Sequence, residues 1–184
     1  SATESSGSVS SLTHSMTIAN NSNRVLIACV SSYGSSPTIT GVTWNGVAMT
    51  AVPNSESYQA GSNNRTQIYY IIAPATGSHS IVASYSGSAT CSVGGMSFYN
   101  VNQTTPVEAG NTSSATATAT SSLALTPTVT GSWIIAMISS SSSLGTATGL
   151  TQSYALNTNA LVRGGRNESP TIGSANTVGW GSSS

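Results

Sequence analysis

The sequence predicts an all-β protein built as a single antiparallel β-sandwich with almost no helix. Segments rich in Val, Ile, Thr and Tyr alternate with clusters of Gly, Ser, Asn and Pro at intervals of about 8–12 residues. No segment keeps an apolar period of about 3.6 residues, which a helix packed on a core requires. The length of 184 residues fits one sandwich domain.

The β-forming segments give the expected strands in order along the chain. These strands lie at 9–19, 24–33, 38–44, 47–52, 65–72, 78–86, 91–99, 114–120, 123–130, 132–139, 147–156 and 171–180. The clearest hairpin turns at Asn45-Gly46, because this pair tolerates the positive φ angles of a two-residue type I′ turn. A second connection, at 74–77, joins two further expected strands.

Two stretches have unusual composition, and one precedes the expected sandwich. Residues 115–120 alternate Ala and Thr, which fits either an edge strand or an extended linker, and the serine run 139–143 is expected to be a loop. Residues 1–8 are expected to form a flexible or partner-contacting tail, followed by the sandwich domain at 9–184.

Charge is almost absent from the chain. The sequence has no lysine and no aspartate, and charged residues make up 4% of it, against about 25% in an ordinary soluble domain. Lysine nucleophiles, phosphate-binding lysines and aspartate-rich calcium loops are therefore excluded. Four scattered arginines give no basic patch for nucleic acid. Zero net charge favours association between molecules, and serine and threonine supply about a third of the positions.

Three segments in order resemble a known group of domains. They read VTWNGVAMT at 42–50, IYYIIAPATG at 68–77 and MSFYNVNQTTP at 96–106. The series resembles a diffuse family of jelly-roll-like β-sandwich domains in secreted surface proteins of bacteria and archaea and in phage structural proteins. The resemblance covers roughly residues 9–180 and implies a jelly-roll-like fold in an extracellular, cell-surface or virion setting. Its motifs mark turns and core strands and carry no catalytic residue.

The chain departs from that family at its last strand. Such domains close with a further apolar strand after the segment that matches 176–180, and here only a few small residues follow. Either the chain is truncated, or a neighbouring subunit fills the open edge. Residues 1–11 of another copy are the donor expected first, although Ala2 and Val9 are their only apolar anchors. The alternative is that this tail drapes over a neighbour.

The residues that could carry catalysis or bind a metal are few and scattered. His14 and His79 lie in separate expected strands, where ordinary strand histidines are the simpler interpretation. No Gly-x-Ser-x-Gly elbow is present for a serine hydrolase. The glutamates available as paired carboxylates lie in the tail or in loop-like stretches: Glu4, Glu56, Glu108 and Glu168. We expect no catalytic residue, no metal site and no cofactor.

Cys29 lies within an expected strand and Cys91 opens another. In a secreted protein two cysteines suggest a disulfide. The competing interpretation is that both are buried free thiols that pack as small apolar residues. The sequence leaves both open, because strand adjacency cannot be derived from it.

The glycosylation pattern Asn-x-Ser/Thr occurs five times, each time in or beside an expected loop. The asparagines are Asn20, Asn64, Asn102, Asn111 and Asn167. Glycans at these positions would hydrate a surface that lacks charge. In a chain so rich in Asn, Ser and Thr, several matches also arise by chance.

Aromatic side chains flanked by hydroxyls and amides suit carbohydrate binding. Trp44, Tyr58 and Trp180 are the candidates for a sugar-stacking platform. The competing interpretation is that they fill the core or a contact between subunits.

The function that fits this sequence best is a non-enzymatic extracellular structural subunit. It would assemble with copies of itself into a surface filament, a pilus-like fibre or a virion-type particle, by packing neutral hydroxyl-rich faces. The alternative is a carbohydrate-binding or adhesive module of a larger secreted or phage protein, with polysaccharide as partner. Membrane insertion is not expected, because no apolar run approaches the ~18 residues of a membrane span.

Overall fold

The computed structural model describes residues 1–5, 7–34, 37–108, 120–140, 143–157 and 161–182. Its strands are β1 (Ala2–Glu4), β2 (Val9–Ile18), β3 (Val25–Tyr33), β4 (Ile39–Trp44), β5 (Val47–Ala48), β6 (Thr50–Ala51), β7 (Ser57–Gln59), β8 (Asn64–Ile72), β9 (Gly77–Phe98), β10 (Thr120–Leu125), β11 (Ile134–Ser140), β12 (Leu144–Thr148), β13 (Thr151–Leu156), β14 (Leu161–Asn167) and β15 (Asn176–Ser182). The predicted all-β, antiparallel fold is confirmed. The described residues contain no helix that could cross a membrane.

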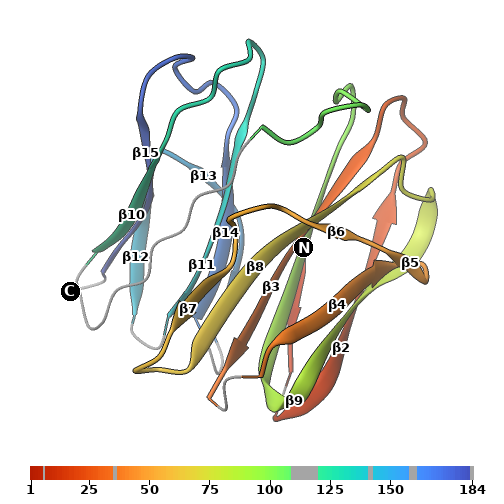
Figure 1. Cartoon of the computed structure of the whole chain (residues 1–184), viewed down its shortest axis with the longest axis vertical. Helices are drawn as coiled ribbons and strands as arrows, with labels where there is room; N and C mark the ends of the chain where they lie inside the picture. Colours follow the sequence, from red (N-terminus) through yellow and green to blue (C-terminus); the bar gives the residue numbers. More distant parts are fainter. Residues whose placement is uncertain (6, 35–36, 109–119, 141–142, 158–160, 183–184) are drawn as a thin grey trace.

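The strands stack in layers along the width of the molecule (Figure 1). The outer layer consists of β2, the first half of β9, β4 and β5. The next contains β1, the second half of β9, β3, β8, β6 and β7. Beyond it lie the sheets β11-β14-β13 and β10-β15-β12. The finer assignment to a jelly roll stays a prediction.

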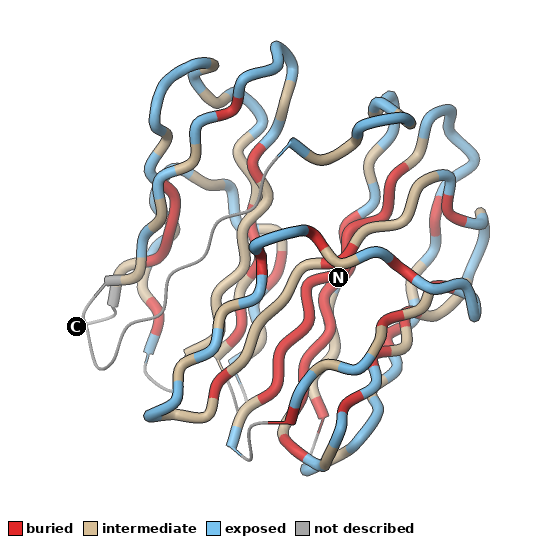
Figure 2. The backbone as a smooth tube through the Cα atoms, viewed as in Figure 1, coloured by how far each residue is buried: buried red, intermediate tan, exposed pale blue. Residues whose placement is uncertain are grey.

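β3 is the strand on which both main cores depend. Leu26, Ala28 and Val30 face the core shared with the outer layer, whereas Val25 and Cys29 face the core shared with the β11-β14-β13 sheet. Successive side chains in a strand point to opposite faces, so a continuous apolar run predicts burial on both sides. Figure 2 shows this strand and its neighbours as the most continuously buried part of the chain.

The prediction of two strands at 78–86 and 91–99 is wrong, because Gly77–Phe98 forms the single continuous strand β9. Its first half pairs with β2 and β4, and its second half pairs with β1 and β3. The stretch at 87–90 contains only small residues apart from one threonine, and its composition predicts a break between the two strands. It stays extended and lets the strand bend from one layer into the next.

The Asn45-Gly46 turn is confirmed. Asn45 has a φ of 48° and Gly46 a φ of 78°, and the flanking residues Trp44 and Val47 pair directly. Two consecutive positive φ angles are those of the type I′ turn. The turn fixes the register of β4, and therefore which of its side chains enter the core.

Other strand boundaries differ from the prediction, two of them because a glycine interrupts the expected strand. Gly149 has a φ of 65° and divides the expected strand 147–156 into β12 and β13, which belong to different sheets. Gly173, with a φ of 73°, keeps the start of 171–180 out of β15. The expected strand 47–52 is split into β5 and β6, and 123–130 corresponds to the earlier β10. The expected strand 114–120 lies outside the described residues except for Thr120.

The N-terminal residues differ from the expected tail. Ala2 pairs with Gly94 and Glu4 pairs with Ser92, so β1 is an edge strand of the chain's own sheet. β10 and β12 pair with no other described strand and so form the open edges beside 176–180, whereas β15 lies between them and pairs with both. Its backbone groups are therefore satisfied within the chain.

Candidate functional site

The alternation of side chains in β2 separates a hydroxyl-bearing side from an apolar side. Ile18 is buried in the core, and Leu12 and Met16 pack against that core. The intervening residues are exposed to solvent: Ser11, Thr13, Ser15 and Thr17. A period of two places all four on the outer surface of the molecule.

The neighbouring strands extend these hydroxyls into rows. The rows across the sheet are Ser11–Ser84–Gly41, Thr13–Val82–Thr43, Ser15–Ser80 and Thr17–Ser78. The Oγ atoms of Ser15 and Ser80 lie 3.1 Å apart and form a hydrogen bond across two strands. We call this surface the hydroxyl face. It comprises Ser11, Thr13, Ser15, Thr17, Thr43, Ser78, Ser80, Val82 and Ser84.

The hydroxyl face has no formal charge. None of β2, β4 and β9 contains an arginine or a glutamate, and their two histidines point inward. Serine and threonine hydroxyls both donate and accept hydrogen bonds, and each hydroxyl hydrogen rotates to suit its partner. Two such surfaces can therefore meet without desolvating a charge, which is the main cost of burying ionic groups.

β2 borders the hydroxyl face with an open edge. It pairs with β9 on one side, and no other described strand pairs with it. Exposed edges in soluble proteins are usually protected by lysine, proline or strand shortness. β2 spans 10 residues and contains neither lysine nor proline. The edge can therefore accept a strand from another chain.

The two histidines have structural partners in different places. His14 is buried, its Nδ1 atom lies 2.8 Å from Thr3 Oγ1, and burial lowers its pKa. It thereby ties β1 to β2 across the edge of the core. His79 stacks edge-on against Trp44 and contacts the carbonyl oxygen of Thr76 at 3.0 Å. The described residues contain no group of three potential metal ligands.

The two cysteines do not form the disulfide that was one of the two expectations. Both are buried free thiols. Cys29 pairs with Gly94 and Cys91 pairs with Ser32, so the two cysteines are offset along neighbouring strands and face different cores. Burial raises the pKa of Cys29 to about 12, against a smaller opposing effect of the Tyr154 hydroxyl, and raises the pKa of Cys91 to about 11.

The expected aromatic platform is not formed. Trp44 is 1% exposed and donates its Nε1 hydrogen to the carbonyl oxygen of Ala75. Trp180 is buried as well, and Tyr58 is exposed with the guanidinium of Arg65 at 4.6 Å from its ring centroid. Strand alternation turns both tryptophans inward, so the three rings share no surface. This matches the competing interpretation that tryptophans fill the core.

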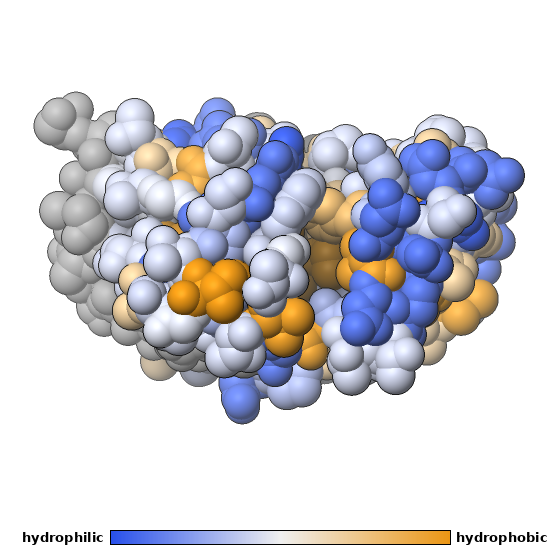
Figure 3. Space-filling view, turned by 90° about the horizontal axis from the view of Figure 1, so that it is seen from above, coloured by the Kyte–Doolittle hydropathy of each residue, from blue (hydrophilic) through white to orange (hydrophobic). Residues whose placement is uncertain are grey.

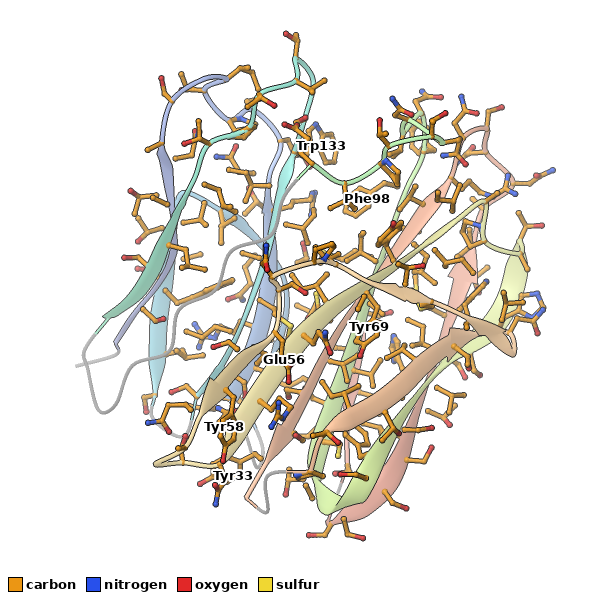
Figure 4. All side chains as sticks on the ribbon, viewed as in Figure 1. Tyr33, Glu56, Tyr58, Tyr69, Phe98 and Trp133 are labelled. Carbon is orange, nitrogen blue, oxygen red and sulfur yellow. The ribbon has the colours of Figure 1, made fainter. Side chains whose placement is uncertain are left out.

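A different aromatic cluster lies at the end of the molecule where β9 ends. Phe98 and Trp133 meet edge to face with ring centroids 5.6 Å apart, and Trp133 is 46% exposed. Figure 4 places this pair at the opposite end from Tyr33 and Tyr58. Strand alternation does not predict the pair, because Trp133 lies just before β11 in a loop.

This end carries a shallow hollow beside the aromatic pair. It is lined by Ile18, Ala19, Asn21, Arg24, Ser97, Phe98 and Tyr99. Figure 3 looks onto this end and shows hydrophilic side chains around a recessed apolar region. A ring stacked over an exposed aromatic here would have amide and guanidinium groups within the same surface.

The expected glycosylation sites differ in exposure. Asn20 and Asn102 are exposed in the loops that follow β2 and β9, and Asn167 is half-buried at the end of β14. Asn64 is the first residue of β8 and is only 6% exposed. The expectation that a glycan could project from this position is therefore not met in the folded chain. Asn111 lies outside the described residues.

No family model, curated protein or solved structure matches the chain. The resemblance to jelly-roll-like surface and phage domains therefore stays an expectation from its sequence motifs.

Proposed function

We propose that this protein is a non-enzymatic structural subunit that assembles with copies of itself through the hydroxyl face. The observation that supports the proposal is a surface of three adjacent strands on which the outward side chains are almost all serine or threonine and none is charged. Ordinary surfaces interrupt such faces with charges, which keep molecules apart.

The contact would combine two kinds of interaction. Hydroxyl rows on one copy face hydroxyls on the next, and each rotates to donate or accept a hydrogen bond. The open edge of β2 adds backbone pairing along the same border of the molecule. Neither interaction depends on charge, which suits a chain with zero formal net charge.

The proposed setting is outside the cell, in a surface filament or a virion-type particle. Its support is the sequence resemblance together with a composition that maintains hydration through hydroxyls and amides. A symmetric contact between two hydroxyl faces closes as a dimer. Growth into a polymer therefore requires a second contact, for which the open edge of β2 is available.

The test introduces one charge into the hydroxyl face. Thr13→Lys places an ammonium group in the middle row beside Val82, where burial against a second copy would desolvate it. Thr105→Lys is the matched control, because it adds the same charge to an exposed loop threonine outside the face. Sedimentation velocity and electron microscopy of the wild type at neutral pH should show polymers. The Thr105→Lys polymers should persist, and the Thr13→Lys chain should sediment as a folded monomer.

Two results would overturn the proposal. One is a wild-type chain that stays monomeric at every concentration tested. The other is equal assembly of the two lysine variants, which would exclude the hydroxyl face as the contact. Circular dichroism of both variants separates lost assembly from lost folding.

The second candidate is carbohydrate binding at the aromatic cluster. The observation in its favour is the exposure of Tyr99 (62%) and Trp133 (46%) beside the polar side chains of the hollow. Flat aromatic faces with a polar border suit sugar rings. Retention of the monomer on a polysaccharide column, abolished by Trp133→Ala and kept by Trp133→Phe, would favour this function over assembly.

A further inference from the structure

Hydrogen bonds link two pairs of loops at one end of the molecule. The backbone N–H groups of Asn100 and Val101 donate to the carbonyl oxygens of Ser22 and Asn23, which links the loop after β9 to the loop after β2. Gly173 donates to the carbonyl of Pro127 at 2.8 Å, which links the loop after β14 to the loop after β10. Figure 1 shows these loops together at the upper end, and we call it the loop end.

Two of the glycosylation sequons on the loop end have a defined local geometry. The side-chain oxygen of Asn102 accepts hydrogen bonds from the backbone N–H groups of Thr104 and Thr105 at 2.8 and 3.1 Å. The side-chain oxygen of Asn167 accepts one from Ser169 at 2.9 Å. In both, the hydrogen-bonded residue Thr104 or Ser169 is the third residue of the sequon.

This geometry prepares the amide for modification. The hydrogen bond holds the carbonyl oxygen of the side chain toward the backbone, so the Nδ2 group points the other way. The Nδ2 groups of Asn102 and Asn167 have no hydrogen-bond partner among the described residues. Each nitrogen is therefore available to an enzyme that approaches the loop.

The third sequon is exposed on the adjacent loop, and a fourth provides the contrast. Asn20 is exposed just after β2, at a tight bend closed by the hydrogen bond from Asn21 N to the carbonyl oxygen of Ala19 at 2.9 Å. Asn64 lies at the opposite end of β8 from Ile72 and is buried. Folding therefore places three of the described sequons at the loop end, with Asn20 and Asn102 exposed and Asn167 half-buried, and buries the fourth, Asn64.

We propose that Asn20, Asn102 and Asn167 are N-glycosylation sites that concentrate glycans on the loop end. The donor is an oligosaccharide linked through a diphosphate to a lipid. Nδ2 forms a bond with the anomeric carbon while the carbon–oxygen bond to the phosphate breaks. The phosphate leaves with that electron pair, and the amide nitrogen loses one proton to a base of the transferase. No atom is oxidised or reduced.

Glycans on the loop end would help to hydrate a surface that has few charges. The chain has too few charges for electrostatic repulsion to keep its molecules apart in solution. Sugars on the loop end supply hydration there and leave the central rows of the hydroxyl face unmodified. The inference does not depend on self-assembly, because it rests on the exposure and geometry of the sequons alone.

The test uses the folded full-length chain, an oligosaccharyltransferase that accepts Asn-x-Ser/Thr, and a lipid-linked oligosaccharide. Glycopeptide mapping by mass spectrometry should find sugar at Asn20, Asn102 and Asn167. A peptide of residues 60–70 should be modified at least about tenfold faster than Asn64 in the folded chain, because the buried site requires local opening first.

Two variants separate modification from a purely structural role of the turn. Asn102→Asp keeps an oxygen for the hydrogen bonds at Thr104 and Thr105 but removes the acceptor nitrogen. Thr104→Val keeps the backbone donor but destroys the sequon. Both should fold and lose the sugar at position 102 while Asn20 and Asn167 remain modified.

The proposal is overturned if the three loop-end sequons stay unmodified in the folded chain. It is equally overturned if Asn64 in the folded chain reacts as fast as its peptide, since exposure would then not select the sites. Neither result bears on assembly through the hydroxyl face, which is measured on the unglycosylated chain.

Discussion

The ring of Tyr154 lies in a narrow space between two layers, and a glycine lines this space on each side. A Cβ atom added at Gly94 would lie 2.2 Å from Cζ of the tyrosine ring, and one added at Gly164 would lie 2.3 Å from its Cε1. Gly94 belongs to β9 and Gly164 to β14, so the ring fills space between two different sheets. The absence of side chains at these positions is what lets the layers approach.

Alanine at Gly94 should therefore destabilise the fold. Overpacking of a closed core costs typically about 1–3 kcal/mol. Gly87→Ala is the matched control in the same strand, because its added Cβ would meet only Pro37 Cβ at 3.9 Å. Urea denaturation measures the free energy of unfolding of the two variants. Equal free energies of unfolding would show that the space around Tyr154 is not closed.

The two cysteines should resist chemical modification while the chain is folded. Both thiols are buried with raised pKa values, so few thiolates form at pH 8 and none is accessible. A thiol reagent added to the native chain without reductant should leave Cys29 and Cys91 unmodified. After unfolding in denaturant, two thiols per chain should react. Absence of reaction after unfolding would reveal a disulfide and contradict the register of β3 and β9.

Glu108 organises the connection between β9 and the second half of the chain. Its Oε2 atom accepts hydrogen bonds from Thr128 N at 2.8 Å, Thr128 Oγ1 at 2.7 Å and Val129 N at 3.3 Å, and its other oxygen accepts one from Ser132 Oγ. The hydrogen bond from Ser132, followed by those from Thr128, lowers the pKa of the carboxyl group. The carboxylate thereby clamps the loop that precedes Trp133.

The clamp should make stability depend on pH in a defined direction. Folding lowers the pKa of Glu108, so its ionised carboxylate adds to the free energy of unfolding. This stabilisation is complete above the ordinary carboxyl pKa. It is lost as the pH falls through the pKa of the folded state. Glu108→Gln should lower the free energy of unfolding at pH 7 by at most about 1 kcal/mol, since the site is exposed to solvent.

The difference in free energy of unfolding between Glu108→Gln and the wild type should disappear in strong acid. Glu168→Gln is the control, because that exposed carboxylate pairs with Arg166 instead of holding a loop. Thermal unfolding at several pH values provides the measurement. A difference that stays constant from neutral to strongly acidic pH would rule out the carboxylate as the clamp.

Local patterns in the sequence predict elements well where one residue type decides the geometry. Asn45-Gly46 identifies its turn, because few other residues accept two positive φ angles. The apolar run of β3 likewise predicts a strand buried on both faces. Composition fails in β9, where small residues that resemble a loop stay extended, with Ala89 paired to Val9 and Thr90 paired to Tyr33.

At the scale of the whole molecule, the stacking of layers could not be predicted from the sequence. Which face of one sheet meets another depends on pairs such as Gly94 and Tyr154, whose separation along the chain hides their contact. The same reason explains why the aromatic platform is not formed, since Trp44 is buried in the core of the outer layer whereas Trp180 lies beside Gly165 of β14. The hydroxyl face was predictable only as a tendency of the composition, because its rows require the pairing of β2, β9 and β4.

Assembly through neutral faces should be nearly insensitive to salt. Contacts driven by charge weaken as the Debye length falls to about 8 Å at physiological ionic strength. This chain has four arginines and four glutamates, and none lies on the hydroxyl face. Light scattering of the polymers should therefore change little between low and moderate sodium chloride and decrease in chaotropic salts. Disassembly by sodium chloride alone would indicate a contact through charges.

Electron cryo-microscopy of the assembled material would show whether the hydroxyl face forms the contact between copies. A reconstruction at side-chain resolution identifies which strands of one subunit face the next. We predict that β2, β9 and β4 lie in the contact, with Thr13, Ser15 and Ser80 buried between copies. A reconstruction in which these residues face solvent, with the contact formed by other layers, would contradict the account.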